Sequence, residues 1–264
     1  MSESGTRLHS LRWGDRDLPP LVLLHGGGAN AHWWDHLAPA FADRFHVVAL
    51  DFRGHGDSDR PADPMPGAFN DDLAALLLDL GQRPATLVGH SMGAHVALDH
   101  AARHLPPALV LLDPSRGGDE RHSRRLRLAL SLRQSYARRE DAIDRYRFLP
   151  DSVHASETLR RSVAEHSVDQ NPDGSWGYKF DPRWFGLPRG ARPDPQCVTC
   201  PTLVVRGAES KILSEEGARA LRDELPHGEL VTLARAGHHV QIDRPDELIR
   251  AIRDFLERHP ISLS

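Results

Sequence analysis

Six short apolar runs constrain the fold of this 264-residue chain more than any other sequence feature. They contain almost no polar residues, and a run without polar alternation is typical of a strand that is covered on both faces. Helix-like stretches lie between most of the runs, and such an order favours a mostly parallel sheet with helices on both sides. The expected strands are residues 21–24, 47–50, 86–88, 108–112, 203–205 and 230–233.

Four other stretches are typical of helices. One of them stops before Pro106 and Pro107, which cannot continue a helix. Another begins with Pro245 and has acidic residues in its first turn, as the starts of helices prefer. Together with the strands they predict an α/β fold built on a doubly wound sheet. The expected helices cover residues 71–80, 94–104, 215–224 and 245–258.

The alternation of strands and helices stops in the middle of the chain. Residues 121–139 are rich in arginine with partial helical periodicity, and residues 171–195 are rich in proline, glycine and tryptophan. We interpret residues 114–195 as an inserted lid, and residues 1–113 and 196–264 as the core of the fold. The arginines could bind an anionic substrate, although a solvated helix face is the commoner reason for such a run of charge.

Charge and hydropathy exclude several classes of protein. Lys and Arg number 33 and Asp and Glu number 37, so the formal net charge is −4, unlike the concentrated positive field of a nucleic-acid-binding protein. No apolar run approaches the roughly 20 residues that a membrane-spanning helix needs. Residues 1–6 lack the pattern of a signal peptide, and two cysteines are few enough to suit a reducing compartment. We therefore expect a cytoplasmic protein with no nucleic-acid or membrane partner.

The sequence Gly89-His90-Ser91-Met92-Gly93 stands between an expected strand and an expected helix. A G-x-S-x-G motif in this strand–turn–helix context is typical of a serine nucleophile. The sharp turn presents the serine oxygen, and the flanking glycines avoid side-chain collisions. A glycine-rich turn with a passive serine is the alternative. The context favours the first interpretation, and we predict that Ser91 is a nucleophile.

A glycine-rich segment, His25-Gly26-Gly27-Gly28, follows the first expected strand. Its backbone can approach a substrate closely and point N–H groups at a developing negative oxygen. We expect an oxyanion hole whose first donor is the amide of Met92 and whose second is the amide of Gly27, with Gly28 as the alternative. A phosphate-binding loop is the competing interpretation, but it would need a Walker lysine or G-x-G-x-x-G spacing, and the sequence has neither here.

The segment Gly237-His238-His239 lies between the last expected strand and the last expected helix. In a doubly wound sheet this position lies in the crevice at the carboxyl ends of the strands. A histidine there could take the proton from Ser91 and return it to the leaving group. We predict His238, which directly follows the glycine, as the base, with His239 as the alternative.

These motifs, in this order, resemble those of the α/β-hydrolase superfamily, in its branch of small, lid-bearing esterases. The resemblance covers nearly the whole chain except the predicted lid. It implies an α/β-hydrolase fold and the chemistry of a serine hydrolase, but it does not indicate the substrate. The matching segments are H-G-G-G at 25–28, D-F-R-G-H-G-D-S at 51–58, G-H-S-M-G at 89–93, C-P-T-L-V-V-R-G at 200–207 and G-H-H at 237–239.

The acid that should orient the histidine is missing from its usual place. The family commonly has a Gly-x-x-Asp pattern after the strand before the last one, and residues 207–210 read Gly-Ala-Glu-Ser instead. A second position in the superfamily lies directly after the strand that follows the nucleophile helix, and the chain has Asp113 there. A carboxylate at that neighbouring strand end could reach the same histidine. We therefore predict Asp113 as the acid of the triad, with Glu209 as the alternative.

The predicted function is hydrolysis of a carboxylic ester, thioester or lactone through an acyl-serine intermediate. Carbon–carbon bond hydrolases and elimination enzymes use similar triads, and the arginines of residues 114–195 would suit their acidic substrates. A non-catalytic ligand-binding protein on the same fold is the third possibility, which the altered residues 207–210 keep open. We expect a small-molecule substrate, no cofactor and no metal.

Overall fold

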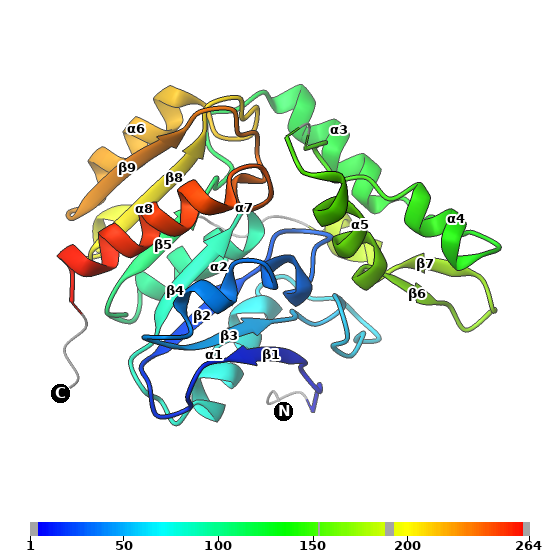
Figure 1. The fold of residues 1–264 in the computed structure, drawn as a ribbon, viewed down its shortest axis with the longest axis horizontal. Coiled ribbons are helices and arrows are strands. Elements are labelled where there is room, and N and C mark those ends of the chain that lie inside the picture. The colour runs from blue at the N-terminus through cyan, green and yellow to red at the C-terminus, as the bar shows by residue number, and fades with distance from the viewer. Residues whose placement is uncertain (1–4, 153, 188–192, 261–264) are drawn as a thin grey trace.

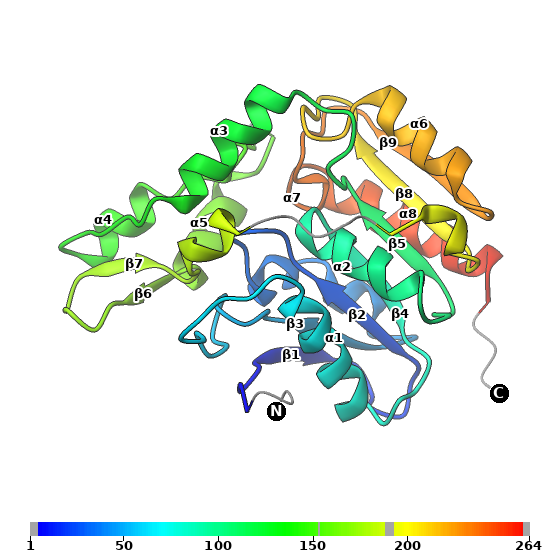
Figure 2. The same ribbon diagram turned by 180° about the vertical axis from the view of Figure 1, so that it is seen from behind.

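A computed structural model describes residues 5–152, 154–187 and 193–260, and within them the chain forms a seven-stranded sheet with helices on both sides (Figures 1 and 2). The strand order is β1-β3-β2-β4-β5-β8-β9. Only β1 runs antiparallel to its neighbour. The strands are β1 (Ser10–Trp13), β2 (Pro20–Leu24), β3 (His46–Leu50), β4 (Thr86–His90), β5 (Leu109–Leu112), β8 (Thr202–Gly207) and β9 (Gly228–Leu233).

Two apolar cores cover the two faces of this sheet. Val22 and Leu24 of β2 belong to one core, and Leu21 and Leu23 of the same strand belong to the other. Successive side chains of a strand point to opposite faces, so both faces must be apolar when both are covered. This is the physical reason for the uninterrupted apolar runs, and it confirms the predicted fold class.

Each core is closed by its own helices. The first is covered by α1 (Ala68–Asp79), α2 (Met92–Ala101) and α6 (Glu215–Glu224), of which α1 and α2 face the reader in Figure 2. The second is covered mainly by α8 (Pro245–Arg258), which crosses the front of Figure 1. Three short helices add to it: η1 (Ala31–Trp34), η2 (Ala38–Phe41) and α7 (Val240–Asp243).

Residues 114–195 leave the sheet after β5 and return just before β8, its neighbour in the sheet. In both views this segment lies to one side of the sheet (Figures 1 and 2). It has a small apolar core of its own, around Phe148 and Val163, which also packs against Trp33. Its elements are α3 (Glu120–Ser131), α4 (Arg139–Asp144), α5 (Glu157–His166), β6 (Val168–Gln170), β7 (Trp176–Tyr178), η3 (Pro182–Gly186) and, at its end, η4 (Pro195–Cys197). Residues 153 and 188–192 of the predicted lid lie outside the described residues.

The helix expected over residues 121–139 is two helices, α3 and α4, with extended chain between them. Tyr136 exchanges two backbone hydrogen bonds with Trp176 of β7, at 2.8 Å each. A residue that pairs with a strand in this way cannot also continue a helix. The long-range pairing, which the local periodicity does not reveal, therefore overrides the helical pattern.

Several elements have no counterpart among the sequence predictions. The edge strand β1 reads S-L-R-W and is only partly buried, so it lacks an uninterrupted apolar run. The hairpin strands β6 and β7 have three residues each, and only one residue of each is buried. Such short, half-exposed strands carry too few apolar positions to show a period. Among the described residues, no helix is both long enough and apolar enough to cross a membrane.

Candidate active site

Ser91 lies at the turn between β4 and α2. Its φ of 51° and ψ of −107° put a non-glycine residue in a sparsely populated, strained conformation. The turn is possible only because of its two glycines. A Cβ at Gly89 would lie 2.4 Å from the Gly93 carbonyl oxygen, and one at Gly93 would lie 2.3 Å from the Leu24 carbonyl oxygen. The backbone therefore holds the serine side chain out of the sheet at a fixed angle.

His238 follows β9 and precedes α7, and its ring lies against Ser91. Its Nε2 is 2.9 Å from Ser91 Oγ, and its Nδ1 is 2.7 Å from Asp113 Oδ1. A carboxylate only accepts hydrogen bonds, so Nδ1 carries the ring proton and Nε2 is the acceptor for the serine hydroxyl. The ring is 6% exposed and Asp113 is fully buried. The structure thus brings the serine, the histidine and the aspartate into one hydrogen-bonded chain.

Asp113 directly follows β5, and its carboxylate accepts hydrogen bonds from other groups besides His238. Its Oδ1 also accepts a hydrogen bond from Ser210 Oγ at 2.6 Å, and its Oδ2 accepts one from the Gly207 amide at 3.0 Å. Burying a carboxylate is costly unless its oxygens are hydrogen-bonded, and three donors meet that cost here. Ser210, which stands where the family usually has an aspartate, is thus one of the donors that hold the carboxylate from the neighbouring strand.

The alternative acid and the alternative base lie elsewhere. Glu209 Oε2 is 2.9 Å from His154 Nε2 in a largely exposed pair, and Glu209 does not reach His238. The ring of His239 packs against Trp33 and Phe148 instead of Ser91. Burial, followed by the charge of His238, lowers the pKa of His239 well below the usual histidine value, so its ring is neutral.

The glycine-rich segment is tied to the nucleophile turn. The Gly93 amide donates to the His25 carbonyl at 3.1 Å, and a Cβ at Gly26 would lie 3.3 Å from Ser91 Cβ. His25 is buried, and its Nε2 accepts a hydrogen bond from the Phe52 amide at 3.1 Å. Both expected oxyanion donors, Gly27 and Met92, line the same cavity as Ser91. The alternative donor, Gly28, is absent from the lining, and its φ is 74°.

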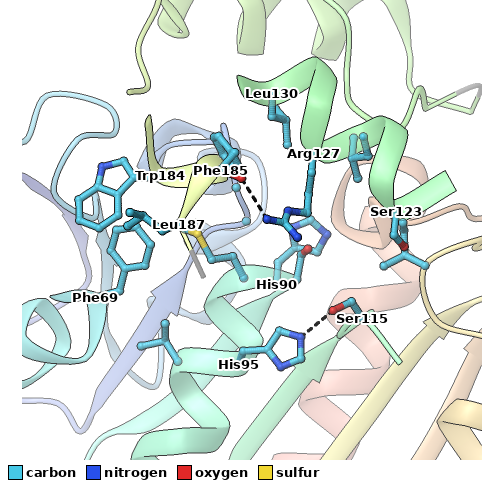
Figure 3. Close-up of a pocket in the computed structure, with 18 of the residues that line it drawn as sticks. Phe69, His90, His95, Ser115, Ser123, Arg127, Leu130, Trp184, Phe185 and Leu187 are labelled. Atoms are coloured by element: carbon cyan, nitrogen blue, oxygen red, sulfur yellow. Dashed lines mark hydrogen bonds between the residues drawn. The ribbon is translucent and has the colours of Figure 1, made fainter. Parts of the chain in front are cut away.

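A cavity of about 380 Å³ opens over Ser91, within the range of small-molecule sites. One side of it is the sheet edge, with the glycine loop, His238 and one face of α2. The opposite side comes from the segment 114–195 (Figure 3). Residues of that segment in the lining include Leu126, Arg127, Leu130, Trp184, Phe185 and Leu187.

Several lining residues escaped the sequence analysis. His95, Val96 and Asp99 share one face of α2 with Met92, at the spacing i, i+3, i+4 and i+7. His95 Nε2 lies 2.9 Å from Ser115 Oγ at the beginning of the segment (Figure 3). The sequence did contain a signal for these residues, because a helix that begins next to Ser91 must turn one of its faces toward the cavity.

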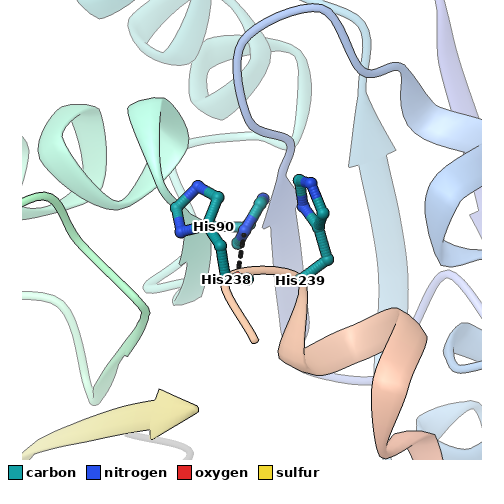
Figure 4. Close-up of side chains that lie close together, drawn as sticks. All are labelled: His90, His238 and His239. Carbon is teal, nitrogen blue, oxygen red and sulfur yellow. Dashed lines mark hydrogen bonds between the residues drawn. The ribbon is translucent and has the colours of Figure 1, made fainter. Parts of the chain in front are cut away.

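Three histidines lie close together beside the nucleophile: His90, His238 and His239 (Figure 4). One ring nitrogen from each lies within 4.8 Å of the others. Imidazole is a good ligand for Zn²⁺ and similar ions. However, His238 already uses both nitrogens, and His90 Nε2 is hydrogen-bonded to the His238 carbonyl at 3.0 Å. His238 could bind a metal here only by giving up its contact with Ser91 or with Asp113.

The matches with known proteins show the family. The model of the alpha/beta hydrolase family matches residues 21–251. An esterase of Mycobacterium tuberculosis is 30% identical over 95% of this chain and 86% of its own length. A 2-(acetamidomethylene)succinate hydrolase of Mesorhizobium japonicum is 28% identical over 90% of this chain and 88% of its own.

Solved structures give the same result for the fold. An alpha/beta hydrolase from Novosphingobium aromaticivorans superimposes with a TM-score of 0.83 at 30% identity. The match covers 98% of this chain and 96% of that one. The similarity therefore extends through the segment 114–195 as well as the sheet.

Proposed function

Because this chain belongs to the alpha/beta hydrolase family, we propose that it hydrolyses a carboxylic ester, thioester or lactone through an acyl-serine intermediate. The relatives support hydrolytic activity in general. The observation that carries the finer proposal is the chain of two short hydrogen bonds from Ser91 through His238 to Asp113. These are the contacts that a nucleophile, its base and the orienting acid require.

In the first half of the reaction, Ser91 Oγ attacks the substrate carbonyl carbon while His238 Nε2 takes the hydroxyl proton. The fully buried carboxylate of Asp113 keeps the proton on Nδ1 and stabilises the imidazolium that forms. The tetrahedral intermediate then collapses, and the imidazolium gives its proton to the departing alcohol or thiol. The acyl group remains on Ser91. In the second half, water takes the place of the serine hydroxyl and releases the acid.

The developing oxyanion needs fixed donors that face the cavity. We assign this role to the amides of Met92 and Gly27. Met92 begins α2, so its amide is among those at the helix N-terminus that have no partner within the helix. Gly27 has no side chain, and a Cβ there would lie 2.7 Å from the Phe185 ring. A larger residue would therefore push the loop or Phe185 away from the position that the intermediate occupies.

We assign the role of a lid to residues 114–195. The segment supplies one side of the cavity, and its aromatic residues Trp184 and Phe185 lie over the glycine loops at 26–28 and 54–56. Excluding water from this cavity would strengthen each electrostatic interaction inside it.

The test uses a fluorophosphonate, which reacts with an activated serine and leaves a covalent adduct. We expect the protein to gain one adduct at Ser91, detected by mass spectrometry of the peptide. The variant Ser91→Ala should remain unlabelled and lose at least 10³-fold in turnover of a 4-nitrophenyl ester. The control is Ser115→Ala, because Ser115 lines the same cavity, and this variant should still be labelled. Folded protein whose Ser91 stays unlabelled would contradict the proposal and favour a ligand-binding protein.

Hydrolysis of a carbon–carbon bond, or elimination from an acidic substrate, is the second candidate. Arg127 favours it, because this arginine lines the cavity that contains Ser91. The relative from Mesorhizobium japonicum is named for a substrate that contains succinate. Such a reaction would use the same serine and histidine, so the labelling test applies to it as well.

A further inference from the structure

Arg127 lies on the one face of α3 that points into the cavity. Ser123, Leu126 and Leu130 line the cavity with it, at the spacing i, i+3, i+4 and i+7. Figure 3 shows the Arg127 side chain pointing from α3 into the pocket. Arg124, on the same helix, is exposed and does not line the cavity. The helix thus sends one of its several arginines toward the nucleophile.

The guanidinium of Arg127 has no acidic partner among the described residues within 4.0 Å. Its Nη2 donates a long hydrogen bond of 3.3 Å to the Phe185 carbonyl. Arg138 and Arg160 of the same segment do have acidic partners, Asp141 and Asp151. The exposed arginines of α3 form no ion pair with the described residues either, but Arg127 is the one that lines the cavity. A guanidinium offers five N–H donors and stays protonated at any working pH. Most of the hydrogen-bonding capacity of Arg127 therefore remains available inside a half-buried site.

The other charged groups that line the cavity do not balance this cation. Asp99 lines the cavity too, but it accepts a hydrogen bond from Asn70 at 2.6 Å and forms an ion pair with Arg103, just beyond the C-terminal end of α2. Burial lowers the pKa of His90 well below its usual value, as it does for His239, so these two rings carry no charge. The cavity therefore has an excess of positive charge at Arg127.

We propose that Arg127 binds a carboxylate of the substrate, so that the preferred substrate of this site is a small ester that carries a second, anionic carboxyl group. The inference rests on the proposed hydrolase function. A guanidinium fork can hold both oxygens of a carboxylate, which fixes orientation as well as charge. Leu126 and Leu130 line the cavity beside Arg127, and apolar surroundings strengthen a contact between opposite charges. The cavity volume of about 380 Å³ accommodates a short ester of this kind.

The experiment compares esters of similar size, one anionic and one neutral in each pair. 4-Nitrophenyl hydrogen glutarate and 4-nitrophenyl hexanoate differ in the acyl group, and 4-acetoxybenzoate and its methyl ester differ in the leaving group. We expect the protein to prefer the anion in at least one of the pairs, measured as kcat/KM. In the variant Arg127→Gln, kcat/KM for that anion should fall about tenfold relative to its neutral counterpart, the effect of one charged hydrogen-bonded contact. Arg127→Lys should keep part of the preference, since it keeps the charge without the fork.

The control is Arg124→Gln, which removes one positive charge from the exposed side of the same helix and should leave the preference unchanged. Equal losses for the anionic and the neutral ester in Arg127→Gln would overturn the inference, because they would mean that Arg127 only supports the Phe185 loop. Turnover of all four esters without an anionic preference would also overturn it and leave the proposed hydrolase intact. Failure of the hydrolase proposal has a different signature, namely no turnover of any ester and no phosphonate adduct on Ser91.

Discussion

The two sides of the cavity are built in different ways. On the sheet side, Ser91 and Asp113 directly follow the buried strands β4 and β5, and His238 lies in the loop between β9 and α7; hydrogen bonds join the three. On the side of residues 114–195, the lining comes from one face of α3 and from η3. Isolated backbone bridges join the segment to loops that follow strands of the sheet, among them the bridge between His55 and Phe180.

This difference separates chemistry from selection. The sheet side holds groups within hydrogen-bonding distance of one another, and an atom displaced by 1 Å would break the chain of proton transfer. The segment side offers shape, apolar surface and one cation, and such contacts tolerate change more easily. Substitutions on the sheet side should therefore lower turnover by large factors, and substitutions on the segment side should mainly change which substrate is preferred.

The largest effect in this comparison is expected for Asp113→Asn. An amide at this position can donate to Nδ1 of His238 and so stabilise the wrong tautomer, in which Nε2 carries the proton and cannot accept one from Ser91. The loss of kcat should be on the order of 10⁴-fold. The measurement is the hydrolysis of a 4-nitrophenyl ester at pH 7.5, with circular dichroism to establish that the variant is folded.

Glu209→Ala is the matched control for this prediction. Asp113 follows β5 and Glu209 follows β8, and these two strands are neighbours in the sheet. Of the two acids, Asp113 contacts His238, and Glu209 contacts His154 instead. The alanine variant should keep wild-type kcat within a factor of two or so, as expected for an exposed pair of small energetic value. An order-of-magnitude loss in Glu209→Ala with little loss in Asp113→Asn would reverse our assignment of the acid.

Much of the sheet could be predicted from the sequence, because two-sided burial gives each strand an uninterrupted apolar run. The nucleophile turn could be predicted because strain and close packing demand glycine at residues 89 and 93. The position of Asp113 beside His238 is harder to predict from the sequence. It depends on the pairing of β5 with β8, which about 90 residues separate in the chain. The residues around Asp113 give no local signal of that pairing.

For the segment 114–195, the sequence predicts only that the alternation of strands and helices is interrupted. Its helix α3 is amphipathic, but the sequence contains arginines on more than one face, so it does not say which of them points inward. The answer depends on how α3 packs over the sheet, and η3 lies directly against it. The break at Tyr136 likewise depends on a partner 40 residues away, Trp176. Elements whose form is set by distant contacts have weak local signals.

Ser210 offers a further test of the comparison, because it contacts Asp113 on the sheet side without lining the cavity. Its hydroxyl donates a hydrogen bond to Asp113 and accepts hydrogen bonds from the amides of Ile212 and Leu213, at 3.1 and 3.2 Å. We expect Ser210→Ala to lower kcat/KM about tenfold for anionic and neutral esters alike, since the carboxylate loses one donor and some of its fixed orientation. The same ester pairs that test Arg127 measure this effect, and a change in preference instead of a uniform loss would argue against a positioning role.

Ser214→Ala is the control for Ser210. Ser214 caps α6 by accepting the Gly217 amide at 2.9 Å and has no contact with Asp113, so its loss should lower stability without lowering kcat/KM. If both variants lower kcat/KM equally, the effect of Ser210 comes from general loosening of the loop that follows β8.

The smallest effect concerns the junction between the two sides. His55 is buried there, and its ring lies against Phe180 and Phe185 of the segment. Two backbone hydrogen bonds flank it: the Gly56 amide donates to the Lys179 carbonyl at 2.8 Å, and the Asp181 amide donates to the Gly54 carbonyl at 2.7 Å. Burial, followed by the charge of His25, lowers the pKa of His55 to about 3.

This shift makes the junction sensitive to acid. A histidine in the unfolded chain binds a proton below about pH 6.5, whereas His55 in the folded protein does not until about pH 3. Below pH 6.5 the unfolded state therefore binds more protons, and the free energy of unfolding falls by about 1.4 kcal/mol per pH unit from this group. Between pH 7.5 and 5.0 the loss from His55 should be about 2 kcal/mol.

The variant His55→Asn removes the titrating group and keeps an N–H donor for the Arg53 carbonyl, which lies 3.3 Å from Nδ1. Urea unfolding at pH 7.5 and 5.0 measures the difference in free energy, and we expect this difference to be smaller in the variant than in the wild type by about 2 kcal/mol. The exposed His227→Asn serves as the control and should leave the difference as it is in the wild type. The comparison within each protein cancels any constant destabilisation caused by the substitution. An unchanged difference in His55→Asn would mean that the junction opens to solvent before the protein unfolds, and that the two sides of the cavity are less firmly joined than the buried histidine indicates.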